Sequence, residues 1–265
     1  MSHDTAPVAE ETPPPASTQQ LAGRGPANPR HRAALTAGVA LLLLAVVAAV
    51  ANLVVVQGLV PDGSEQVVVD SELAFRLAVA GLYVVIALDV LVAWALMRVF
   101  HPVNAALSQL AGWFRLAYSA VFLVAIAQLN GIPELLSSRG TSSFSPDQVD
   151  ALALAKVEAY TDIWMAGLLL FGVHLTLLGY LTYRSAQMPN LLGVLLVVAG
   201  LGYAFDTFAV VMSTGSPFPV TTVTFLGEFL LALWLVIRGH RLTQDETIPA
   251  AAARAPGLLA MPKEK

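Results

Sequence analysis

The chain has 265 residues, of which 57% are hydrophobic and 12% are charged, and its formal net charge is -4. A soluble domain carries about a quarter charged residues, so the composition argues against a water-soluble domain and indicates a surface that faces lipid. No basic stripe marks a nucleic-acid site. The absence of cysteine excludes disulfides, thiolate metal sites, a cysteine nucleophile and a lipid anchor on cysteine.

The chain begins with residues 1–30, which are rich in Pro, Ala, Ser, Thr, Gln and Gly and predict a disordered tail. Residues 33–61 then contain no charge, and about 20 apolar residues suffice to span a bilayer. We predict a first span near 33–57. A cleaved signal peptide ending at Ala49-Val50-Ala51 is the alternative, but the apolar run continues past that point and favours a span.

Five further spans are predicted by the same length rule, near residues 74–99, 107–129, 160–182, 191–212 and 222–237. Ser145-Pro146-Asp147-Gln148 has the pattern of a helix start, with Ser as N-cap, Pro at the first helical position and Gln closing a capping box. We therefore expect the fourth long helix to begin outside the membrane and to run into it unbroken. Residues 242–265 predict a second disordered tail. The predicted fold is an all-α bundle of six transmembrane helices over residues 31–241.

The distribution of basic residues predicts the orientation. Of the 14 Lys and Arg residues, all but Arg76, Arg139 and Lys156 fall toward the side that holds the two termini. The loops of the other side are acidic. Because cytoplasmic loops carry the excess of Lys and Arg, we expect a protein of the cytoplasmic membrane with both termini in the cytoplasm.

An acid stands in the middle of the second predicted span, in the otherwise apolar stretch LYVVIALDVLVAWAL. This residue, Asp89, lies about nine residues above the inner end of its helix, and Arg115 lies about as far above the inner end of the next one. A short turn joins the two helices, so Asp89 and Arg115 should lie at one depth on neighbouring helices. A structural pair that fixes the hairpin and a functional pair are both open.

Two more ionisable residues share this level. Counted in the same way, His174 and Glu228 lie about nine and ten residues above the inner ends of their helices. Four ionisable residues in one layer can form a proton relay or a substrate site, although His174 and Glu228 can equally be satisfied by neighbouring helices. A further buried acid, Asp206, is expected nearer the outer side. Arg76 and Asp162 are expected near the outer interface, either paired or each extended into water.

Motif searches assign no chemistry to the chain. It contains no phosphate-binding loop, no dinucleotide fingerprint, no His-Glu-x-x-His motif and no Gly-x-Ser-x-Gly elbow. We therefore predict no catalytic residue, no metal site and no cofactor. The expected partner is the lipid bilayer.

Several segments together resemble a family of bacterial membrane proteins, domain of unknown function 4386, over roughly residues 33–239. The resemblance rests on these positions: Phe75-Arg76-Leu77, Asp89, Phe114-Arg115-Leu116, Gly172 with His174, Gly179-Tyr180, Pro189, residues 200–206 and Gly227-Glu228. It implies a polytopic membrane protein and carries over no activity.

Three functions remain open at this stage. The first is a non-enzymatic membrane protein in which the layer of Asp89, Arg115, His174 and Glu228 is structural. The second is a small-solute or proton-coupled transporter that uses this layer, which requires a cavity reaching it. The third is an intramembrane enzyme acting on a lipid-like substrate, which requires a lateral opening beside His174.

Overall fold

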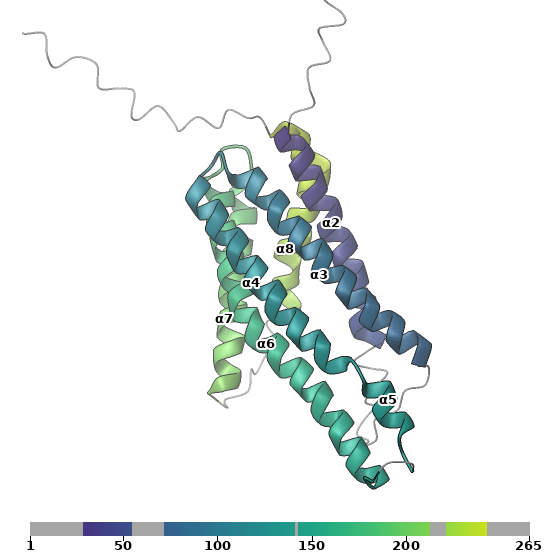
Figure 1. Ribbon diagram of the computed structural model, residues 1–265. Coiled ribbons are helices and arrows are strands. Elements are labelled where there is room, and N and C mark those ends of the chain that lie inside the picture. Colours follow the sequence, from purple (N-terminus) through teal and green to yellow (C-terminus); the bar gives the residue numbers. More distant parts are fainter. Residues whose placement is uncertain (1–28, 55–71, 141–142, 213–220, 243–265) are drawn as a thin grey trace, which may run out of the picture.

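The computed structural model describes residues 29–54, 72–140, 143–212 and 221–242, and within these ranges every regular element is a helix. The two predicted tails and most of the first outer loop lie outside the described residues. The helices are α2 (Pro29–Asn52), α3 (Glu72–Phe100), α4 (Ala105–Leu129), α5 (Ile132–Ser137), α6 (Pro146–Arg184), α7 (Asn190–Val211), α8 (Thr221–Arg238) and the short 3-10 turn η2 (Gly239–Arg241). The predicted spans fall on the six long helices (Figure 1).

Five of the described helices are long and apolar enough to cross a membrane, namely α2, α3, α4 with α5, α6 and α7. The sixth predicted span coincides with α8, which has 18 residues. Large apolar side chains are exposed on the outside of these helices, among them Val46, Leu77, Trp113, Val198 and Phe205. Soluble proteins rarely expose such extensive apolar surface, and a lipid environment accounts for it.

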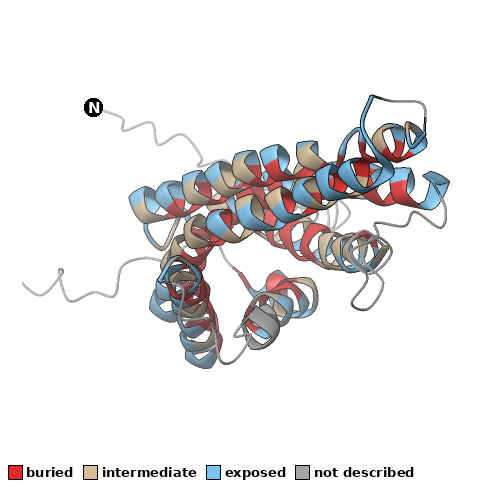
Figure 2. Ribbon diagram, turned by 90° about the horizontal axis from the view of Figure 1, so that it is seen from below, coloured by how far each residue is buried: buried red, intermediate tan, exposed pale blue. Residues whose placement is uncertain are grey.

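The six long helices form a closed ring. Each packs mainly against its neighbours in the chain, in the order α2, α3, α4, α6, α7 and α8, and α8 then packs against α2. Seen from below, buried residues line the inward faces of the helices and exposed residues cover the outward ones (Figure 2). The beginning of α2 and the end of α8 lie at the same end of the bundle, where η2 contacts both helices.

The turns at this end are set by local sequence. Asn104 caps α4 by accepting a hydrogen bond from the Leu107 amide at 3.0 Å, and the Ser108 hydroxyl donates to the Met97 carbonyl across the α3–α4 hairpin at 2.8 Å. Pro189 stands at the N-cap of α7, where the missing N–H of proline is not needed by the helix. These short turns make consecutive helices antiparallel neighbours.

At the opposite end, α6 extends beyond the bundle beside α5 (Figure 1). Its start is the predicted one: Ser145 is the N-cap, Pro146 follows it, and the capping box with Gln148 is formed. The helix has 39 residues and is therefore about 58 Å long at 1.5 Å per residue, roughly twice the ~30 Å hydrocarbon core. The expectation of one unbroken helix that starts at Pro146 is confirmed.

Two glycine pairs hold α6 and α7 together. A Cβ added at Gly172 would lie 2.6 Å from the Gly200 carbonyl oxygen, and one added at Gly179 would lie 2.7 Å from the Gly193 carbonyl oxygen. Each helix carries its two glycines seven residues apart, so both lie on one face. The backbones of α6 and α7 are consequently in direct contact, as is common between membrane helices that present small residues.

The buried apolar residues form two clusters. One includes Ala37, Val99 and Leu235 and fills the half of the bundle where α2 begins and α8 ends. The other includes Leu82 and Ile126 and fills the half near α5. Asp89 on α3 and Arg115 on α4, described next, lie where the two clusters meet.

Candidate functional site

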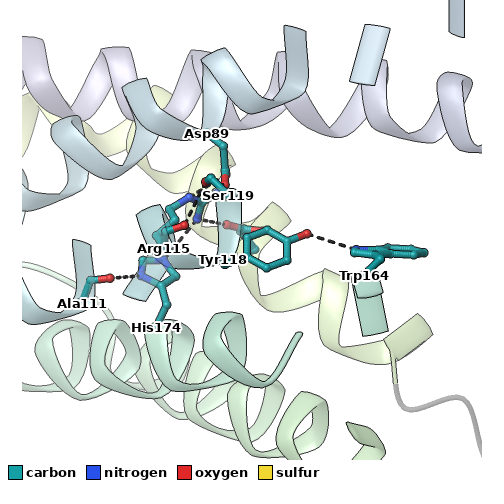
Figure 3. A network of polar contacts seen from close by, with 8 residues as sticks. Asp89, Ala111, Arg115, Tyr118, Ser119, Trp164 and His174 are labelled. Atoms are coloured by element: carbon teal, nitrogen blue, oxygen red, sulfur yellow. Dashed lines mark hydrogen bonds and ion pairs between the residues drawn. The ribbon is translucent and has the colours of Figure 1, made fainter. Parts of the chain in front are cut away.

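The four ionisable residues predicted to share a layer lie in contact at the centre of the ring. Asp89 comes from α3, Arg115 from α4, His174 from α6 and Glu228 from α8. Arg115 is the hub: it lies within hydrogen-bonding distance of each of the other three. Figure 3 shows the Arg115 side chain with Asp89 and His174 around it.

The guanidinium of Arg115 uses all of its nitrogens. Its Nε donates to Asp89 Oδ1 at 2.8 Å, and its Nη2 forms an ion pair with the same oxygen at 2.6 Å. Its Nη1 donates to Glu228 Oε1 at 2.6 Å and lies 3.2 Å from His174 Nε2. The cation also lies over the Phe171 ring, 5.3 Å from the ring centre. The Arg115 side chain is only 1% exposed, and these contacts replace the water that a buried charge would lose.

His174 takes part without an additional charge. Its Nδ1 donates to the Ala111 carbonyl at 2.8 Å, which leaves Nε2 as the acceptor for Arg115 Nη1. Both ring nitrogens are therefore satisfied in the neutral imidazole. His174 is buried, at 1% exposure, and holds Arg115 from the side of α6.

Ser119 completes the coordination of Asp89. Its hydroxyl donates to Asp89 Oδ2 at 2.5 Å, so both oxygens of the carboxylate are bonded. Sequence reasoning missed Ser119, although its position four residues after Arg115 places it on the same face of α4. The same face carries Tyr118, whose hydroxyl accepts a hydrogen bond from Trp164 Nε1 at 3.2 Å (Figure 3).

A cavity of about 380 Å³ reaches this cluster from the interior of the ring. All six long helices contribute to its wall, and three members of the cluster, Asp89, Arg115 and Glu228, line it. His174 lies behind Arg115 rather than in the wall. Apart from Asn52, the rest of the described lining is apolar or aromatic: Leu44, Ala45, Ala48, Ala49, Val85, Tyr118, Phe122, Trp164, Leu168, Phe171 and Tyr203.

The aromatic part of this wall was also missed by sequence reasoning. Tyr118 and Phe122 lie four apart on α4, and Trp164 and Phe171 lie seven apart on α6, so each pair occupies one helical face. These spacings point to a shared face, but they do not distinguish a ring that lines a cavity from one that fills a core.

The remaining candidate residues lie away from the cluster. Arg76 contacts Glu72 at 2.8 Å and Glu134 at 2.5 Å on the surface of the α3–α5 end. The suggested pairing of Arg76 with Asp162 is therefore replaced by these contacts, because Glu134 on α5 is brought next to α3 and Asp162 is exposed on α6. Asp206 is buried on α7, as expected.

Within the described residues, no group of three His, Asp or Glu side chains is arranged to hold a metal ion. The three carboxylate and imidazole groups of the cluster are turned toward a guanidinium instead. Chemically, the arrangement provides a buried, hydrogen-bonded set of charges at the edge of an apolar cavity.

Comparison with known proteins agrees with the resemblance noted in the sequence. The family described as Domain of unknown function (DUF4386) matches residues 36–239. A relative from Archaeoglobus fulgidus, described as "Uncharacterized protein", is 32% identical over 172 residues, which cover 65% of this chain and 90% of the relative. No solved structure matches the chain. The relative carries the same family, so the resemblance to a bacterial family extends to an archaeon.

Proposed function

The chain belongs to the DUF4386 family, and from this premise we propose that it is a non-enzymatic, multi-pass protein of the cytoplasmic membrane that binds a small solute in its central cavity, as a carrier does. In this proposal α8 is the sixth span and both termini lie in the cytoplasm. The observation that carries the proposal is the cavity of about 380 Å³ that reaches Asp89, Arg115 and Glu228.

The cavity separates this proposal from the two alternatives. A purely structural charged layer needs only a closed bundle, in which apolar side chains would fill the space beside the charges. An intramembrane enzyme that uses His174 needs the imidazole to face its substrate, but both ring nitrogens are already bonded and the side chain lies behind Arg115. A concave, mostly apolar site with a few convergent polar groups is the usual form of a small-molecule site.

The location of the cavity supports a carrier in particular. Substrate sites of membrane carriers lie near the middle of the bilayer, at the interface between groups of helices. Here the cluster lies between the two apolar halves of the bundle, and helices from the beginning, middle and end of the described chain all contribute to the cavity wall.

The absence of cysteine in the chain allows a direct test of solvent access. Single cysteines are placed at Ala48, which lines the cavity, and at Val46 on the same helix, which is 63% exposed on the outer surface. Both variants are reconstituted in lipid vesicles and treated with N-ethylmaleimide, which reacts with the thiolate and therefore needs a hydrated thiol.

We expect Ala48→Cys to react at least about tenfold faster than Val46→Cys, because the thiol pKa is raised in an apolar environment. Ala34→Cys, a buried position outside the cavity wall, should react slowly and serves as the control for burial. Equal and slow reaction at all three positions would show a dry, closed bundle and would reject the proposal.

A further inference from the structure

The charges of the cluster do not balance. Asp89 and Glu228 contribute two carboxylates, Arg115 contributes one guanidinium, and the bonds of His174 are those of a neutral ring. With both acids ionised, the cluster therefore has one negative charge in excess. An isolated charge is costly in a low-dielectric interior, so this excess requires a proton or another cation.

The excess charge meets the cavity at Glu228. The Glu228 side chain is 14% exposed, whereas Asp89 and Arg115 are 4% and 1% exposed. Asp89 has both of its oxygens bonded by Arg115 and Ser119, whereas for Glu228 the described contact is made by Oε1 with Arg115. Both acids line the cavity, and Glu228 is the more exposed of the two to a molecule inside it.

The walls of the cavity favour a cation with an apolar body. Five aromatic rings line it, from Tyr118, Phe122, Trp164, Phe171 and Tyr203, and the faces of aromatic rings attract ammonium groups. Small alanines on α2 form another part of the wall. A hydrated metal ion would find few oxygen ligands there, because ions such as Ca²⁺ take six to eight.

An anion is disfavoured by the same contacts. Among the described residues of the cavity wall, Arg115 is the only cation. Its donors are directed to Asp89, Glu228 and His174. An anion would have to displace one of these buried partners, which would leave a carboxylate unpaired at considerable cost.

We propose that the solute bound in the cavity is a monovalent organic cation, an ammonium group on an apolar body, whose charge is placed against Glu228 and among the aromatic rings. This inference rests on the proposed function, since it names the ligand class of the same cavity.

The test measures protection of the Ala48→Cys thiol from N-ethylmaleimide. Three probes are compared at equal free concentration: benzyltrimethylammonium, its uncharged isostere 2,2-dimethyl-1-phenylpropane, and the anion phenylacetate. We expect the cation to slow labelling at concentrations at least about tenfold below those of the other two. The substitution Glu228→Gln in the same background should raise the half-protecting concentration of the cation at least about tenfold.

Glu134→Gln is the matched control, because Glu134 is also a carboxylate paired with an arginine but lies outside the cavity wall. It should leave protection unchanged. If the thiol is labelled but the cation protects no better than the neutral or anionic probe, or if Glu228→Gln has no effect, the ligand class is wrong while the solute-binding cavity stands. If the thiol is not labelled at all, the proposed function fails as well.

Discussion

At the scale of the residue, the defining feature is one buried arginine shared by two acids. Arg115 bonds Asp89 within the α3–α4 hairpin and Glu228 across the ring. The first contact satisfies the charge locally, and Ser119 reinforces it. The second contact adds an acid that the guanidinium does not need for neutrality. The two carboxylates therefore have different roles in the energetics of the fold.

This difference gives a prediction on stability. Arg115→Gln leaves two acids without their cation and should lower the free energy of unfolding by about 3–5 kcal/mol, the usual cost of breaking a buried pair. Glu228→Gln keeps the shape and leaves a neutral pair, so the stability should stay equal or rise. Unfolding of the purified variants by SDS titration in mixed micelles measures both. A loss for Glu228→Gln as large as that for Arg115→Gln would contradict the assignment.

A second prediction concerns the charge of Glu228. The substitution Glu228→Gln keeps the size of the side chain and removes its negative charge, so benzyltrimethylammonium and its uncharged isostere should protect the Ala48→Cys thiol equally in this variant. A preference for the cation that persists in Glu228→Gln would assign recognition of the charge to another group of the cavity wall.

Counting residues from the inner turns predicted that Asp89, Arg115, His174 and Glu228 share one depth, because helical rise is regular. Depth alone does not tell which face of a helix points inward, so the direction of each bond had to come from the structure. Arg76 illustrates the limit. Its partner Glu134 lies 58 positions away on α5. This helix is too short to be recognised from a periodic pattern of apolar residues.

At the scale of the element, the packing of α6 against α7 leaves no room for side chains larger than hydrogen at four glycines. Gly172 and Gly179 face Gly200 and Gly193 in antiparallel order. Two glycines seven residues apart, as on α7, are typical of a helix face that a neighbouring helix approaches closely. The spacing does not identify α6 as that neighbour, because any helix with a small-residue face can be the partner.

A third prediction follows for these glycines. Gly200→Ala places a Cβ against the backbone of α6, 2.7 Å from the Thr176 nitrogen, and should lower the stability by about 1–3 kcal/mol, as overpacking does. Gly81→Ala is the control, because its nearest neighbour would be a Val47 methyl group at 3.5 Å. This control should be neutral or stabilising, since Ala favours the helix. Equal midpoints of thermal unfolding for both variants would contradict the close packing.

The boundaries of the long helices were predictable where capping residues or proline mark them, as at Ser145 and Pro189. Hydropathy alone marks only the span 160–182 of α6, which is little more than half of the helix. Hydropathy identifies only the apolar part of such a helix, whereas the capping box identifies its true beginning.

At the scale of the whole molecule, the ring could not be predicted from the sequence. Short connections make successive helices neighbours, which accounts for five of the six contacts in the described ring. The contact of α2 with α8 depends on how strongly the bundle curves, and this is decided by the packing of all the helices together. The central cavity follows from ring closure, and it too was only one of the possibilities left open.

A fourth prediction tests the orientation that the basic residues indicate. Single cysteines are placed at His101, exposed in the α3–α4 turn, and at Ser143, exposed before α6 at the opposite end. A membrane-impermeant maleimide added to intact cells should label Ser143→Cys, and His101→Cys should be labelled only after permeabilisation. The reverse pattern would place both termini outside and would overturn the proposed topology.

The closed ring also has a consequence for synthesis. During translation α4 follows α3, so Arg115 and its partner Asp89 are both present in the chain before the later helices are made. Glu228 arrives with α8, the last described helix, and it is α8 that packs against α2. A ribosome-bound chain that ends before residue 221 therefore already contains Arg115 and Asp89, but it lacks the helix that encloses the cavity. The central cavity thus obtains its complete described wall only when α8 joins the bundle.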